Sequence, residues 1–131
     1  MGKTGSIIAF NAAFEKNVLK AAVKMHPEYG VWVEGVLGRF VDLWVPFRNY
    51  LVYHPGQHGS ASLKAVLPNL TGESYANLEI QGGEMAGWMF RRLMESKDEE
   101  EQETIKTELK RYCGLDTYGM VLILRQLRKL T

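Results

Sequence analysis

The clearest pattern of apolar and polar positions lies near the C-terminus, where apolar side chains recur at helical spacing over residues 103–130. At about 100° per residue, one arc of roughly 80° contains Ile105, Leu109, Tyr112, Asp116, Met120, Ile123, Leu127 and Leu130. The pattern predicts a long amphipathic helix with one side against a core. Asp116 is the exception on that side, because a buried carboxylate usually requires a partner, a raised pKa or a metal ion.

The N-terminal half predicts a strand followed by a helix. Residues 6–10 form an apolar run without alternation, which is typical of a buried, central or parallel strand. A helix is expected over residues 12–25, and Glu15 is a second carboxylate among its apolar positions. The remaining expectations are a short helix at 28–37, a strand at 39–53, loops at 54–60 and 71–83, short helices at 62–67 and 84–96, and a solvated junction at 97–102. This order favours an α/β layer.

Composition narrows the class of protein without identifying it. A chain of 131 residues suggests a single domain over residues 1–131. The net charge of +1 predicts no strong attraction to nucleic acid or membranes, so a nucleic-acid contact would require a local patch. The single cysteine, Cys113, fits a reducing compartment, and no apolar run reaches the roughly 18 residues of a membrane span. We therefore expect a cytoplasmic protein with no membrane partner.

Glu15 and Asp116 are the candidate site carboxylates, and two interpretations stay open. They could be ligands for Mg²⁺ or Mn²⁺, hard cations that prefer oxygen, in a two-metal site for phosphodiester hydrolysis. Tyr112, one turn before Asp116, would then orient the attacking water. Alternatively, each carboxylate caps a helix, pairs with an arginine such as Arg91 or Arg111, or lies at the edge of a core.

Three basic side chains around the predicted loop at 54–60 are candidate nucleic-acid contacts. Arg48, His58 and Lys64 lie in or beside this loop and would meet phosphates. The competing interpretation is that they are ordinary exposed or structural side chains. His54 and His58 also form a possible metal-binding pair, although two loop histidines are more often structural.

Two short motifs resemble those of a nuclease superfamily. Residues 7–15 (Ile-Ile-Ala-Phe-Asn-Ala-Ala-Phe-Glu) resemble the second motif of the DnaQ-like, ribonuclease-H-fold 3′–5′ exonucleases, and residues 112–116 (Tyr-Cys-Gly-Leu-Asp) resemble the third. Nearly the whole chain is similar to the bacterial domain of unknown function 2779 family. The similar segments are 40–43, 46–49, 62–68, 74–75 and 112–117.

This resemblance implies a partial ribonuclease-H-like (DnaQ-like exonuclease) fold, helix-rich and lacking the first three strands. It implies that Glu15 and Asp116 are catalytic metal ligands for Mg²⁺ or Mn²⁺ and that Tyr112 orients the water. Asn11 and Phe14 would support the site. The sequence departs from the superfamily pattern because Glu15 replaces the usual Asp and the first motif, Asp-x-Glu, is missing.

We therefore expect the C-terminal part of a nuclease domain, with an incomplete two-metal site that is inactive alone. Missing N-terminal strands or another protein region would complete it, and the intact parent would cleave DNA or RNA. The alternative is a non-catalytic ribonuclease-H-fold module that binds nucleic acid or a protein partner. A third possibility is a structural domain whose carboxylates are satisfied internally.

Overall fold

The computed structural model describes residues 4–130 and divides into two compact units. The first unit ends at Val66 and the second begins at Leu67. The expectation of a single domain over residues 1–131 stays a prediction.

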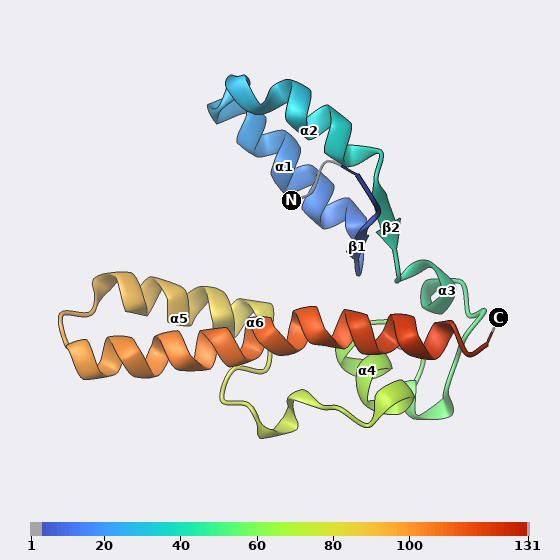
Figure 1. The fold of residues 1–131 in the computed structure, drawn as a ribbon. Coiled ribbons are helices and arrows are strands. Elements are labelled where there is room, and N and C mark those ends of the chain that lie inside the picture. The colour runs from blue at the N-terminus through green and yellow to red at the C-terminus, as the bar shows by residue number, and fades with distance from the viewer. Residues whose placement is uncertain (1–3, 131) are drawn as a thin grey trace. The chain divides into compact units, whose positions relative to one another are not determined.

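The first unit is built around a strand, a helical hairpin and a second strand (Figure 1). Its elements are β1 (Ile7–Ala9), α1 (Ala12–Met25), a 3-10 turn (Pro27–Tyr29), α2 (Gly30–Leu37) and β2 (Phe40–Asp42). The strands pair in parallel, with Ile7 opposite Phe40 and Ala9 opposite Asp42. The two helices form the crossover that a parallel pair requires.

The remainder of the first unit is short helices and turns that close its core. It contains α3 (Val45–Arg48), a 3-10 turn (Pro55–Gln57) and the first residues of α4 (Leu63–Thr71). The buried apolar side chains of this unit are Ala9, Ala12, Val33, Val36, Leu43, Phe47 and Val66. Gln57 is buried as well, and its amide bonds the His54 N–H and the Ser60 carbonyl, so it carries no unsatisfied polar group into the core.

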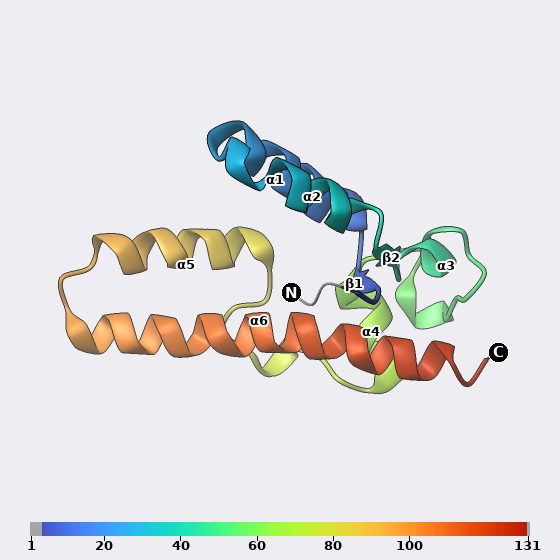
Figure 2. The ribbon, with the colours of Figure 1, turned by 45° about the horizontal axis from the view of Figure 1, so that its top comes forward.

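The second unit is dominated by a long helical hairpin. α5 (Gly83–Glu95) and α6 (Glu99–Leu127) lie side by side in both views (Figures 1 and 2). Asp98 starts α6 because its carboxylate accepts hydrogen bonds from the N–H groups of Glu100 and Glu101. A 3-10 turn (Tyr75–Asn77) precedes the hairpin, and the buried apolar side chains of the unit are Leu67, Tyr75, Ile80, Ile105 and Ile123.

The expected partial ribonuclease-H-like fold is wrong. The chain is mostly helical, and the described residues form one sheet of only two strands. The predicted strand at 39–53 shrinks to β2, because the Asp42 carboxylate accepts the Trp44 N–H and turns the chain. Pro46 then lies in the first turn of α3, where a missing N–H costs nothing.

Several local expectations are confirmed. The strand within residues 6–10 pairs in parallel as expected, but only Ala9 of β1 is buried, and in a sheet of two strands it is not central. The helix at 12–25 forms as expected. α4 differs because it continues through Pro68 to Thr71, whose hydroxyl donates to the Leu67 carbonyl. The acidic part of the 97–102 junction belongs to α6 as its first turn. No helix within residues 4–130 has the length and apolar character needed to cross a membrane.

Candidate functional site

The carboxylate of Asp116 lies in a cluster with two tyrosines inside the second unit. The Tyr75 hydroxyl donates to Asp116 Oδ1 at 2.6 Å. Tyr112 lies one helical turn before Asp116, and its ring centroid is 6.0 Å from that of Tyr75. The loop presents Tyr75 because Ser74 accepts the Ala76 N–H and caps the 3-10 turn.

The electrostatics of this cluster keep both tyrosines protonated. Burial, and then the hydrogen bond to Asp116, raise the pKa of Tyr75 far above its ordinary value. The same two causes raise the pKa of Tyr112 to about 12. Two neutral hydroxyls therefore donate toward one carboxylate. A carboxylate on the core-facing side of a helix can be explained by a partner, a raised pKa or a metal ion. For Asp116 the structure shows a partner, the Tyr75 hydroxyl.

Arg111, one of the two arginines considered as alternative partners, pairs with another carboxylate. Arg111 forms an ion pair with Glu108 at 2.9 Å on the same helix. Tyr75, which does bond Asp116, lies 41 positions away along the chain. The role of Tyr112 as the residue that orients a water stays a prediction.

Glu15 presents a different situation in the first unit. It lies on α1, half-buried, and its Oε2 atom is buried without a hydrogen-bond partner among the described residues. A buried polar atom with no partner costs about 1–3 kcal/mol, and more when it carries charge. The atom therefore requires an explanation, such as a water, a cation or a group from another molecule.

The convergence of Glu15 and Asp116 stays a prediction because the two residues lie in different units. Within residues 4–130, no three His, Cys, Asp or Glu side chains gather as a metal-binding group. The binding of Mg²⁺ or Mn²⁺ by Glu15 and Asp116 therefore stays a prediction.

Asn11 supports the end of the sheet through its backbone. It adopts a left-handed conformation with φ 69°, and its side chain makes no capping hydrogen bond to α1. Its N–H instead donates to Asp42 Oδ1 at 2.9 Å, and the Trp44 N–H donates to the same oxygen at 2.9 Å. Asp42 therefore joins the ends of β1 and β2. Phe14, the other expected supporting residue, is 66% exposed.

The three candidate nucleic-acid contacts lie on separate elements of the first unit. Arg48 ends α3 and stacks over the Trp44 ring at 4.9 Å. His58 follows the 3-10 turn at 55–57 with φ 49°, and Lys64 is exposed in α4. Their contact with nucleic acid stays a prediction.

Two residues of these clusters were not singled out by periodicity. Tyr75 lies in a loop, where no repeat marks a buried side chain, and only its place in the segment 74–75 of the family resemblance drew attention to it. Asp42 lies in the segment 40–43 of the family resemblance, but its hydrogen bond to the Asn11 N–H depends on strand pairing. A carboxylate directly after a predicted strand is the signal that could have indicated this role.

Comparison with known proteins gives a family match for part of the chain. The family described as Domain of unknown function (DUF2779) matches residues 1–62, which confirms the expected resemblance for that segment. The uncharacterized protein MG366 homolog of Mycoplasma pneumoniae is 28% identical over an alignment that covers 90% of this chain and 20% of that protein. The chain thus spans about a fifth of the length of this curated relative. No solved structure matches the chain, and neither match names a DnaQ-like exonuclease.

Proposed function

We propose that this chain is a non-catalytic interaction module that binds a protein surface through one side of α1. The observation that carries this proposal is an exposed apolar stripe on α1. Phe14, Val18 and Met25 are 66%, 52% and 80% exposed. At about 100° per residue, these three side chains fall within an arc of roughly 40°.

The stripe is distinct from the side of α1 that packs in the first unit. Ala12 is buried and lies roughly 160° around the helix from Phe14. Contiguous apolar surface that remains exposed typically marks an interaction site. We infer a partner with an apolar groove that accepts Phe14, Val18 and Met25. The greater length of the Mycoplasma relative is compatible with a groove on another region of the same polypeptide.

Binding of nucleic acid is the competing outcome, and it would use a different side of α1. Lys16, Lys20 and Lys24 follow one another at four-residue spacing, and Lys20 lies roughly 140° from the centre of the apolar stripe. Lys16 is also engaged over the Phe40 ring at 5.6 Å. Because phosphate contacts use charged or polar groups and not apolar side chains, the stripe favours a protein partner.

A photo-crosslinking amino acid tests this proposal in cells that produce the protein. The reporter is placed at position 14 or 25 on the stripe, and at position 20 as the matched control on the lysine side. We expect positions 14 and 25 to crosslink one protein segment, identified by mass spectrometry, and position 20 to miss it. Equal labelling at all three positions would overturn the proposal.

A second experiment addresses the nucleic-acid outcome directly. Fluorescence anisotropy of labelled single-stranded DNA and RNA is measured with the purified chain and with Lys20→Glu. We expect Lys20→Glu to leave the anisotropy of both labelled strands the same as with the unsubstituted chain. If Lys20→Glu weakens binding of the labelled strands and Phe14→Ser does not, nucleic acid and not a protein is the partner of α1.

A second candidate function is metal-dependent 3′–5′ cleavage of DNA or RNA by an intact parent protein, and Glu15 is the observation that favours it. Its partnerless buried Oε2 is a suitable donor atom for Mg²⁺ or Mn²⁺. The other ligands would have to come from beyond the first unit. Binding of Mn²⁺ to the intact parent protein is measured by electron paramagnetic resonance. We expect Glu15→Gln to weaken this binding by about tenfold or more. Unchanged Mn²⁺ binding would remove this candidate.

The same candidate makes a prediction about the chain alone. Labelled single-stranded DNA and RNA are incubated with the chain and Mn²⁺, and we expect no degradation. Degradation that both Glu15→Gln and Asp116→Asn abolish would establish catalysis and overturn the non-catalytic proposal.

A further inference from the structure

One side of the α5–α6 hairpin is an uncovered apolar groove in the second unit. The groove has a volume of about 270 Å³ and is lined by Phe90, Leu93, Lys106, Leu109, Lys110 and Cys113. Phe90 is 57% exposed, and the nearby Met94 is 72% exposed. A two-helix hairpin has no second layer to bury such a surface, and helix pairs of this kind are stable when a further pair packs on them.

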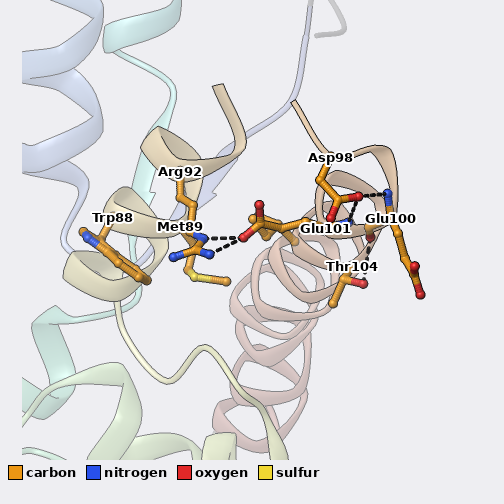
Figure 3. A pocket seen from close by; sticks show the side chains of 8 residues that line it. Trp88, Met89, Arg92, Asp98, Glu100, Glu101 and Thr104 are labelled. Atoms are coloured by element: carbon orange, nitrogen blue, oxygen red, sulfur yellow. Dashed lines mark hydrogen bonds and ion pairs between the residues drawn. The ribbon is translucent and has the colours of Figure 1, made fainter. Parts of the chain in front are cut away.

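The other side of the hairpin has polar side chains that pair with one another. Figure 3 shows Arg92 directed at Glu101, with which it forms an ion pair, and Trp88 beside it. Arg92 also stacks over the Trp88 ring at 5.8 Å. Asp98 is engaged as the cap of α6. The polar side chains of Arg92, Glu101 and Asp98 therefore have partners on this side, whereas the groove beside Phe90 is lined mainly by apolar side chains.

The charges beside the groove have an order that identifies an occupant. Glu99, Glu103, Lys106 and Lys110 fall within roughly 60° on α6, so they form one line of two acids followed by two bases. This line borders the groove, because Lys106 and Lys110 belong to both. Lys106 and Glu103 already meet at 2.6 Å within the helix.

The line is self-complementary under a two-fold rotation. An antiparallel copy of α6, centred between Thr104 and Ile105, places Glu99 opposite Lys110 and Glu103 opposite Lys106. The rotation repeats both pairs with the copies exchanged. An unrelated partner would have no reason to match this spacing, whereas an isologous dimer matches it by construction.

We propose that a second copy of this chain docks antiparallel on this groove and forms a four-helix layer from two α5–α6 hairpins. Phe90, Leu93 and Leu109 form the apolar centre of the interface. The acidic and basic halves of the line form reciprocal ion pairs at its border, as charged positions do beside coiled-coil seams. This inference concerns a surface on α5 and α6 and does not depend on the partner proposed for α1.

The test measures the self-association constant of the full chain by sedimentation equilibrium. We expect a monomer–dimer equilibrium that weakens by about tenfold or more in Lys106→Glu/Lys110→Glu, because attractive pairs become repulsive. Glu99→Lys/Glu103→Lys should weaken it equally. An equimolar mixture of the two variants should form a heterodimer, since one line is then wholly acidic and the other wholly basic.

Controls separate a lost interface from a lost fold. Both variants should keep the helical circular dichroism signal of the parent chain, and Lys97→Glu, off the line, should leave the dimer unchanged. Phe90→Ser should also weaken the dimer, and mixing this variant with either charge variant should not restore the association. A chain that stays monomeric at its highest soluble concentration, or charge variants that fail to associate on mixing, would overturn the proposal.

Discussion

The hydrogen bond from Tyr75 to Asp116 is the contact in the second unit whose removal has the best-defined consequence. Its length of 2.6 Å is that of a charge-assisted bond. Tyr75 is 5% exposed, so a water does not readily replace the lost partner. Hydrogen bonds to charged groups contribute about 1.5–3 kcal/mol. Because Asp116 is only half-buried, we expect Tyr75→Phe to lower the free energy of unfolding by about 2 kcal/mol.

Urea denaturation followed by far-ultraviolet circular dichroism measures this loss. Tyr118→Phe is the matched control, because Tyr118 lies on the same helix with 50% exposure and should change stability by less than about 0.5 kcal/mol. A double-mutant cycle with Asp116→Ala, which removes the accepting oxygen, isolates the interaction. If the double variant loses the sum of the single losses, or if Tyr75→Phe behaves like Tyr118→Phe, the assignment of Tyr75 as the partner of Asp116 is refuted.

Three further predictions use the same denaturation assay. Gly119→Ala should lower the free energy of unfolding by about 1 kcal/mol, since the new Cβ lies 3.0 Å from Leu67 Cδ2. Gly114→Ala meets nothing within 4 Å and should raise it by about 0.5–1 kcal/mol. Equal effects of the two substitutions would contradict this reasoning. Asp42→Ala should cost about 2 kcal/mol through two lost hydrogen bonds, with a smaller loss for Asp42→Asn. The pKa of Tyr112 rises from about 10 to about 12 on folding, so the stability that this shift contributes is present below pH 10 and is lost as pH rises to 12. Tyr112→Phe should therefore reduce the fall in the free energy of unfolding between pH 10 and 12. An unchanged dependence of stability on pH would refute this role of Tyr112.

Local features of the first unit were predictable because short-range chemistry determines them. The helix at residues 12–25 follows from its spacing of apolar side chains, and Pro27 directly after His26 limits its extension. The parallel strand within residues 6–10 follows from an apolar run without alternation. These signals lie within a few residues of the structures that they specify.

The region after β2 was not predictable in the same way. The aromatic and β-branched residues at 39–53 favour a strand by propensity. The structure ends the strand at Asp42, whose side chain bonds the Asn11 N–H from another part of the chain. A hydrogen bond between residues 31 positions apart depends on how the strands pair. Propensity contains no information about that pairing.

The two carboxylates show how far periodicity reaches into the chemistry of a site. Periodicity placed Glu15 and Asp116 in equivalent positions, each among apolar side chains of a helix. The structure distinguishes them, because a tyrosine from a distant loop reaches Asp116 while Oε2 of Glu15 has no partner within the described residues. The free-energy cost of an unsatisfied buried oxygen therefore falls on Glu15. If this protein takes up a cation or a donor group from a partner, Glu15 gains more from it than Asp116, so substitutions of Glu15 are the more informative test of any chemistry.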